Sequence, residues 1–349
     1  MSAAQPRLAR VRSMQLLQAR LRRSVCAVIV VVIVGLGLWA LTLGSSTIAV
    51  AEIVQAVFDE EQTRTRMVVF EWRAPRVVAA IVFGAALAYG GAIFQSLTRN
   101  PLGSPDIIGF STGSYTGVVT MLMLGFTGSF MLALGALAGG LLTAVAIYFL
   151  AYRHGMQGFR FIVVGIAIAA FLSGVNTWFS VKADVDIALR AAVWGAGTLS
   201  VVDWNSVAIG AFMFAILVGL VPFATRMLRV LELGDEVAAS LGARVEPAKA
   251  WLVVFGVAAT ALVTAAAGPI AFVALAAPQI AKRLVGQRVG TDLLSAALVG
   301  ALLLLSADLI AQYAIPSNSL PTGAVTVCLG GAYLVWLLAV ESRKSRGSG

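Results

Sequence analysis

The chain has 349 residues, of which 60% are hydrophobic and only 12% are charged, and its formal net charge is +9. Soluble domains carry about 25% charged residues, so the composition excludes an ordinary water-soluble protein and indicates one polytopic membrane domain. The basic residues lie between apolar runs, which argues against nucleic acid as a partner. Cys26 and Cys328 fall inside apolar runs, so we interpret them as core residues that form neither a disulfide nor a metal site.

The first apolar run, residues 25–43, follows a cluster of arginines. It matches the ~20 residues of a membrane span and exceeds the ~7–15 residues of a secretory signal. We therefore expect an uncleaved first helix, preceded by a basic cytoplasmic arm over residues 1–24.

Apolar runs of similar length recur along the chain and predict an all-α fold with about ten transmembrane helices. The expected spans are residues 25–43, 76–97, 107–124, 129–151, 161–181, 206–225, 250–267, 269–285, 292–313 and 322–340. Only Gly268-Pro269 separates the seventh span from the eighth. Together the spans form a single transmembrane domain over residues 25–340, followed by a cytoplasmic tail at 341–349.

An even number of spans places both termini on the same side of the membrane. If that side is the cytoplasm, 19 of the 25 Lys and Arg residues lie in cytoplasmic segments and 6 lie in outer segments. This asymmetry agrees with the positive-inside rule, so we predict that both termini are cytoplasmic.

The segment between the sixth and seventh spans, residues 231–249, carries too many charges to lie in lipid. Its apolar residues recur at helical spacing, Asp235 and Glu236 suit the first turn of a helix, and Gly242 suits its C-terminal end. The pattern alone leaves two alternatives open, a short amphipathic helix or an ordinary solvated loop.

Motifs of ATP binding and of membrane enzymes are missing from the sequence. There is no GxxxxGK[ST] loop, HExxH or GxSxG, and there are no paired aspartates in the spans. Asp308 is the one acid well inside a span, with Gln312 four residues on. We interpret Asp308 as making a capping or helix–helix hydrogen bond rather than serving as a proton relay. These features predict a chain that is not an enzyme.

Four segments, taken together, resemble the FecCD family of ABC importer permeases, which import ferric siderophores, haem and vitamin B12. They are the opening stretch, WRAPR at 72–76 running on to RNPLGSPDIIGFSTG, GPIAFV to APQIAKR at 268–283, and AD to LPTG and LGGAYLVWLL at 307–338. Gln279 departs from the family's usual His, and Gln312 stands where a basic residue is common. APQIAKRL and LGGAYLVWLL are most similar to ferric-enterobactin-type permeases, which work as two unlike permease chains.

The resemblance implies that residues 231–249 form a coupling element that docks on a separate cytoplasmic ATPase. Its apolar positions would fill a groove on the ATPase and its acids would help to set the register. The residues expected to make this contact are Leu233, Gly234, Asp235, Glu236, Ala238, Leu241 and Gly242. No cofactor is expected on this chain, because ATP and Mg²⁺ would bind the partner ATPase.

The resemblance also implies docking of an extracytoplasmic substrate-binding protein on Arg73 and Arg76, with a weakened third contact at Gln312. Interfacial snorkelling is the alternative for both arginines. Structural roles are expected for Pro101, Gly268, Pro269, Pro278 and Asp308. Ser173, Asn176 and Thr177 in the fifth span either line the pathway or hydrogen-bond neighbouring helices.

The function implied is that of a permease subunit of an ATP-driven importer in the inner or plasma membrane. Its cargo would be a ferric siderophore, with a catecholate favoured, and its partners a second permease in a heterodimer, an ATPase dimer and a substrate-binding protein. Haem or vitamin B12 import is the alternative within the class. A secondary carrier driven by an ion gradient is the alternative from another class.

Overall fold

The computed structural model describes residues 4–44, 48–58, 63–106, 108–152, 158–286, 292–315 and 319–346, which form helices and no β-strand. Each of the ten predicted spans overlaps a helix. These are α1 (Ala4–Thr42), α4 (Ala74–Thr98), α5 (Phe110–Met123), α6 (Ser129–Ala151), α7 (Gly158–Lys182), α9 (Trp204–Gly219) with α10 (Val221–Glu232), α12 (Val245–Ala267), α13 (Val273–Val285), α14 (Leu293–Tyr313) and α15 (Thr322–Arg346). Shorter elements connect them: α2 (Val50–Phe58), α3 (Thr63–Arg66), the π-helix η1 (Met67–Arg73), α8 (Val185–Gly195) and α11 (Asp235–Ser240).

Not every one of these helices is long enough to cross a membrane. Within the described residues six are long and apolar enough, or seven if α9 and α10, bent by 51°, count as one span. α5 has 14 residues and α13 has 13. Helices of that length extend only about 20 Å, whereas the hydrocarbon core is about 30 Å thick. The spans predicted at 107–124 and 269–285 therefore combine a short helix with non-helical backbone.

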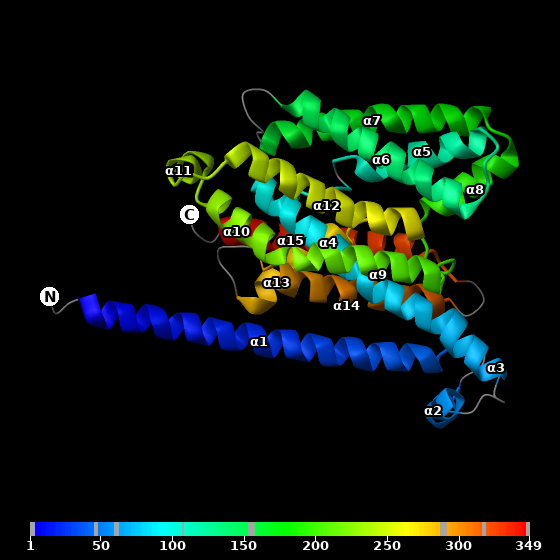
Figure 1. Ribbon diagram of the computed structural model, residues 1–349, viewed down its shortest axis with the longest axis horizontal. Coiled ribbons are helices and arrows are strands. Elements are labelled where there is room, and N and C mark those ends of the chain that lie inside the picture. Colours follow the sequence, from blue (N-terminus) through cyan, green and yellow to red (C-terminus); the bar gives the residue numbers. More distant parts are fainter. Residues whose placement is uncertain are drawn as a thin grey trace.

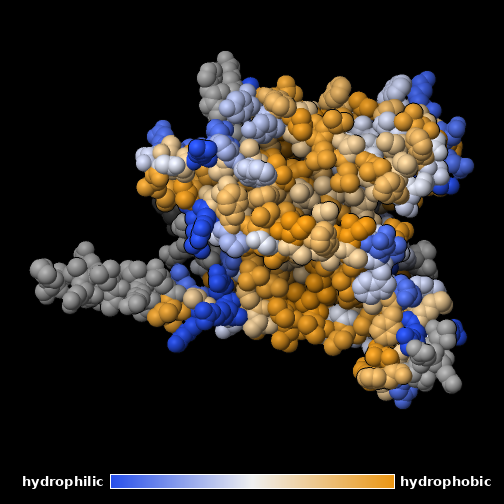
Figure 2. Space-filling model, viewed as in Figure 1, coloured by the Kyte–Doolittle hydropathy of each residue, from blue (hydrophilic) through white to orange (hydrophobic). Residues whose placement is uncertain are grey.

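The helices form a bundle whose two ends differ in their elements (Figure 1). α1 begins and α15 ends at the end of the bundle that also carries α10 and α11. α2, α3 and α8 lie at the opposite end. This arrangement agrees with the even number of spans predicted from the basic residues. The segment after the sixth span lies at the end of the bundle where α1 begins and α15 ends. Figure 2 shows apolar side chains covering the flank of the bundle between these ends.

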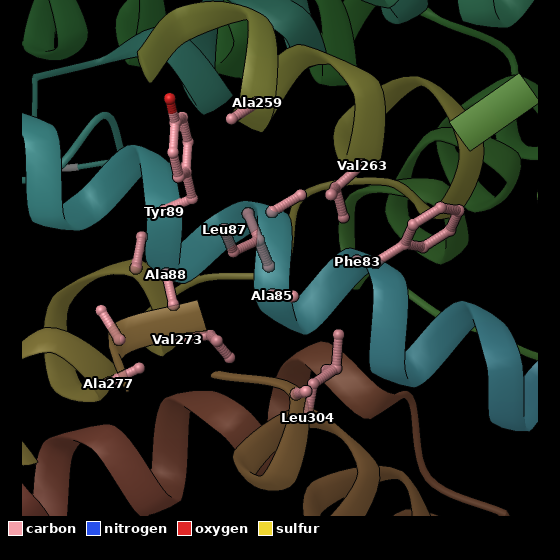
Figure 3. Packing of buried hydrophobic residues seen from close by; sticks show 14 of the residues in the cluster. Phe83, Ala85, Leu87, Ala88, Tyr89, Ala259, Val263, Val273, Ala277 and Leu304 are labelled. Carbon is pink, nitrogen blue, oxygen red and sulfur yellow. The ribbon is translucent and has the colours of Figure 1, made fainter. Parts of the chain in front are cut away.

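Helix α4 runs through the centre of the bundle and is buried over most of its length. It packs against α14, α12, α13 and α9. Figure 3 shows Phe83, Leu87 and Tyr89 of α4 among side chains from α12, α13 and α14. Burial of one helix on all sides explains why its sequence is apolar all round rather than amphipathic.

Small residues let α4 approach its neighbours closely. A Cβ atom built on Gly84 would lie 2.3 Å from the carbonyl oxygen of Gly300 in α14, and one built on Gly300 would lie 2.2 Å from that of Gly84. A Cβ atom on Gly91 would overlap the carbonyl oxygen of Ala274 in α13. Backbone contact of this kind is the usual basis of helix association in lipid, where water cannot drive apolar side chains together.

The chain is non-helical between α12 and α13. Gly268, at φ 74°, ends α12 and Pro269 follows it, so the helix cannot continue. Neighbouring segments satisfy backbone groups here, because the N–H of Thr198 donates to the C=O of Ala267 at 2.8 Å and the N–H of Gly323 donates to the C=O of Gly197 at 2.9 Å. The structural role expected for Gly268 and Pro269 is thus that of ending one helix and opening a non-helical segment before the next. Irregular backbone at membrane depth is tolerated only when protein encloses it in this way.

A π-helix at the outer end of α4 follows from Pro75. The N–H of Ala74 donates to the C=O of Val69, five residues back. The next carbonyl, that of Phe70, would need the N–H of Pro75, which proline lacks. The indole Nε1–H of Trp204, at the start of α9, donates to that carbonyl at 2.6 Å instead. One proline therefore accounts for both the π-helix and the cross-link to α9.

Adding a methyl group at Gly84 tests the close packing of α4. We expect Gly84→Ala to destabilise the protein by about 1–3 kcal/mol, because the helices must move apart to admit the Cβ atom. Gly35→Ala is the matched control, since a Cβ atom there meets nothing within 4 Å. The control should gain up to about 1 kcal/mol from helix propensity. Thermal unfolding in detergent measures both, and equal shifts for the two variants would contradict close packing at Gly84.

Candidate functional site

Residues 231–249 contain a short helix, α11 (Asp235–Ser240), bounded by two glycines, which decides between the alternatives that the sequence left open. Gly234 (φ 105°) precedes α11 and Gly242 (φ 82°) follows it, both in backbone conformations that side chains disfavour. The N–H of Ala243 donates to the C=O of Ala238 at 3.0 Å, which closes the C-terminal end in a Schellman-like bond. A Cβ atom at either glycine would meet nothing within 4 Å, so backbone angle rather than space requires glycine there.

Asp235, the first residue of α11, is bonded to two cations from other helices. Its Oδ1 accepts from Arg99 Nη2 at 2.8 Å, and its Oδ2 accepts from Lys249 Nζ at 2.7 Å. Arg99 also donates to the C=O of Leu231 at the end of α10, at 2.9 Å. Arg99 follows α4 and Lys249 belongs to the first turns of α12. We call Arg99, Asp235 and Lys249 the Asp235 clamp.

The three side chains of the clamp differ in their exposure to solvent. The Asp235 side chain is 45% exposed and that of Arg99 is 53% exposed, whereas that of Lys249 is only 7% exposed. An exposed ion pair contributes about 0–1 kcal/mol, so the Arg99 bond alone adds little stability. The hydrogen bonds of Arg99 instead hold the end of α4 against both α10 and α11. Arg99 stands at φ 50°, an unusual left-handed conformation for a residue other than glycine.

Beyond the clamp, α11 presents an apolar surface to its surroundings. Leu233 is 59% exposed, Val237 47% and Leu241 66%, whereas Ala238 is fully buried against the chain. Glu236 lies on the exposed part of the helix. We call Leu233, Val237 and Leu241 the α11 surface. Three large aliphatic side chains at the end of the bundle that carries the chain termini suit contact with another protein better than contact with water.

At the opposite end of the bundle, Asp308 of α14 is enclosed and accepts hydrogen bonds from three helices. Arg76 of α4 donates to both carboxylate oxygens, with Nε and Nη2 each 2.9 Å from one of them. Gln312 Nε2 donates at 2.7 Å and Thr322 Oγ1, at the start of α15, at 2.8 Å. The Asp308 side chain is 2% exposed. These are the helix–helix hydrogen bonds that the position of Asp308 suggested.

The arrangement around Asp308 bears on the residues predicted to dock a substrate-binding protein. Arg76 and Gln312 point inward to Asp308, and the Arg76 side chain is only 15% exposed. Arg73 Nη1 donates to the C=O of Leu41 at 2.8 Å, which links η1 to the end of α1. All three residues therefore have bonding partners within the chain. Docking through them stays a prediction, and Arg73 and Arg76 are bonded rather than snorkelling freely.

The three polar residues expected in the fifth span differ in their burial on α7. Asn176 is buried, and its Oδ1 has no hydrogen-bond partner among the described residues. Ser173 and Thr177 are exposed, and the Thr177 hydroxyl donates to the C=O of Ser173 at 2.9 Å. Asn176 thus faces neighbouring helices, whereas Ser173 and Thr177 lie on the open face of α7. Pathway lining stays a prediction for the exposed pair.

A polar link at the centre of the bundle was not anticipated from the sequence. Gln95 of α4 donates through Nε2 to the C=O of Leu275 at 2.9 Å, and Gln279 Nε2 donates to Gln95 Oε1. This bond joins α4 to α13, the short helix that contains Pro278. Pro101 lies in the exposed turn after α4.

A second residue that the sequence did not single out is Asp106, in the loop between α4 and α5. Its Oδ1 accepts from the hydroxyl of Ser111 at 2.7 Å, whereas its Oδ2 is enclosed and finds no hydrogen-bond partner in the described part of the chain. Burial raises the pKa of Asp106 to about 6, and the Ser111 hydrogen bond opposes this shift. A carboxyl group that loses its proton near neutral pH is unusual in a loop.

Comparison with known proteins places the chain in a family. The model of the FecCD transport family matches residues 13–340. The chain belongs to the FecCD transport family. The ferric enterobactin transport system permease protein FepG of Escherichia coli (strain K12) is 43% identical over 319 residues, covering 91% of this chain and 96% of that protein. The iron(3+)-hydroxamate import system permease protein FhuG of Bacillus subtilis (strain 168) is 35% identical over 322 residues, covering 90% and 96%.

A solved structure has the same fold as this FecCD chain. It is described as a metal-chelate type ABC transporter in an inward-facing conformation. The match covers 91% of this chain and 99% of that chain. The TM-score is 0.81 at 22% sequence identity. The described helices of this chain therefore have the fold of that structure. The FecCD resemblance seen in the sequence is confirmed by the family match.

Breaking the Asp235 clamp should loosen α11 without unfolding the bundle. In Asp235→Asn, we expect faster amide hydrogen exchange in residues 235–241, because Arg99 and Lys249 lose their shared charged partner. Exchange in α14 should not change. Exchange measured by mass spectrometry on the protein in nanodiscs tests this, with Arg229→Gln, an exposed residue of α10, as the control. Unchanged protection of α11 in Asp235→Asn would mean that the clamp does not hold the helix.

The Asp308 network should be sensitive to the loss of one partner. We expect Arg76→Leu to destabilise the protein by about 3–5 kcal/mol, because it leaves an uncompensated buried charge. The double variant Arg76→Leu/Asp308→Leu should recover part of that loss, since both charges are then removed. Thermal unfolding of the single variants and the double variant measures the coupling between the residues. Additive losses would show that the two residues do not interact.

Proposed function

We propose that this chain is the membrane permease subunit of an ATP-driven importer for a ferric siderophore, with a catecholate siderophore as the favoured cargo. Membership of the FecCD family supports the transport class. The relative with 43% identity is named for ferric enterobactin transport, and the one with 35% identity for iron(3+)-hydroxamate import. The higher identity to the first supports a catecholate over a hydroxamate. The proposed location is the inner or plasma membrane.

The observation that carries the mechanism is the α11 surface together with the Asp235 clamp. A separate cytoplasmic ATPase dimer would bind Leu233, Val237 and Leu241 in an apolar groove, with Glu236 adding an electrostatic contact. Because Asp235 ties α11 to the ends of α4 and α12, a movement of the ATPase would pass to two spans at once. ATP and Mg²⁺ would bind the ATPase, and this chain would contribute no catalytic group.

Two further partners complete the proposed assembly. A second FecCD-type permease of different sequence would pair with this chain, and the two would enclose the pathway. The exposed face of α7 with Ser173 and Thr177 would line part of that pathway. A substrate-binding protein would deliver the cargo at the end of the bundle that carries Arg73. Since Arg76 and Gln312 are bonded to Asp308, Arg73 is the better candidate for that contact.

The alternatives make different predictions. Haem or vitamin B12 import would support growth on those compounds as sources of iron or cobalamin. A secondary carrier would move cargo in vesicles that contain an ion gradient and no ATP. The names of the two relatives reported above concern iron chelates and lend support to neither alternative.

Replacing apolar residues of the α11 surface tests the proposal. We expect Leu241→Asp and Leu233→Asp to weaken assembly with the ATPase by tenfold or more, because about 1.4 kcal/mol of lost apolar contact corresponds to a factor of ten. ATP-dependent uptake of ferric catecholate into proteoliposomes should fall in parallel. Arg229→Gln is the control and should assemble and transport normally. Full assembly and uptake in both leucine variants, or uptake without ATP, would rule out the proposed mechanism.

A further inference from the structure

Helix α2 at the outer end of the bundle has three distinct faces. Successive residues of a helix turn by about 100°, so Val50, Val54, Val57 and Phe58 lie within an arc of about 100°. All four side chains are more than half exposed, and Phe58 is 84% exposed. They form a continuous apolar stripe with no charged residue in it. We call these four residues the α2 stripe.

The other two faces of α2 have different surroundings. Glu52 lies opposite the α2 stripe, Gln55 lies about 110° from the centre of the stripe, and both are exposed. Ala56 lies between the apolar and polar faces on one side and is fully buried. α2 packs against α3, the element next to η1. One side of α2 therefore contacts the protein, while an apolar face and a polar face point in opposite directions.

The position of α2 explains this pattern. Figure 1 shows α2 nearly end-on, crosswise to the long α1, at the outer end of the bundle and off its flank. A helix placed crosswise to a membrane-spanning helix runs along the membrane surface. The N–H of Ile48 donates to the C=O of Thr42 at 3.1 Å, which holds the start of α2 beside the last turn of α1.

The level of the membrane surface can be judged from α1. Leu38 and Trp39, in its last turns, are both more than half exposed, and tryptophan favours the boundary between lipid and water. α2 follows within a few residues, so it lies at that boundary. In Figure 2 the lobe that contains α2 has apolar atoms on its side turned toward the flank of the bundle. The α2 stripe thus continues the lipid-facing surface of α1.

We propose that α2 is an interfacial anchor whose stripe of Val50, Val54, Val57 and Phe58 is inserted into the outer leaflet of the membrane. The opposed polar face, with Glu52 and Gln55, then faces water. A lipid partner fits better than a docked protein, because a protein approaching from outside the membrane would meet the polar face first. Helices of this kind bury their apolar face about 5–10 Å into the headgroup region. The anchor would fix the level of α3 and η1, and it does not depend on which cargo is carried.

Spin labelling of the full chain in lipid nanodiscs tests this proposal. Cys26 and Cys328, the two native cysteines, are replaced by alanine, and single cysteines are introduced as Val54→Cys, Phe58→Cys and Glu52→Cys. Nitroxide labels at these positions are then compared for collision with oxygen, which concentrates in lipid, and with a water-soluble nickel chelate. We expect the labels at 54 and 58 to lie about 5–10 Å below the lipid phosphates and the label at 52 to be in water.

Further measurements separate the possible outcomes. Adding Val50→Asn and Val57→Asn to the Phe58→Cys chain should shift its label toward water, and retained thermal stability of that chain shows that it is folded. Greater access to nickel than to oxygen at 54 and 58, or equal access at 52 and 54, would overturn the proposal. Protection of the label at 54 only after a purified substrate-binding protein is added would also overturn it, because the stripe would then be a protein-docking surface.

Discussion

The structure depends on one constraint, the close approach of α4 to the helices that surround it. In lipid, apolar side chains gain little from leaving their surroundings, so helices associate through backbone proximity and through polar bonds that lipid cannot replace. Gly84 against Gly300 and Gly91 against Ala274 provide that proximity. Gln95 and Gln279 provide a polar bond at the same interface. The other spans are arranged around a helix that is held on several sides.

Each end of α4 carries an arginine bonded to an aspartate of another helix. Arg76, in its first turn, meets Asp308, and Arg99, directly after its last turn, meets Asp235. The two pairs differ in kind. Arg76 lies inside a helix that runs continuously from Arg64 to Thr98, whereas Arg99 lies at the C-terminal end of that helix, where the helix dipole favours a cation. One pair is enclosed and holds the bundle together, and the other is exposed and positions α11.

This arrangement has a consequence for transport. α4 has an ion pair at each end, and it connects the outer surface to the candidate coupling helix. A rigid helix pinned at both ends transmits displacement along its axis better than a flexible one. The breaks before α5 and α13 flank it, so the irregular backbone of the bundle lies next to its most rigid element.

The sequence by itself determined the ten apolar segments that overlap the main helices, the topology and the family. Those properties depend on local hydrophobicity, on where Arg and Lys fall, and on short motifs such as GPIAFV and RNPLG, all of which are written along the chain. It also placed Gly242 and the acids of α11 correctly, because capping is a local effect. Only the tertiary structure decided that Arg99 and Lys249 share Asp235, that Arg76 and Gln312 turn inward to Asp308, and that Asn176 is buried away from Ser173 and Thr177. Arg99 and Arg76 lie more than 100 residues from the aspartates that they bind, and such a separation leaves no periodic signal. A charge that binds another helix therefore looks the same in sequence as one that faces water or a second protein.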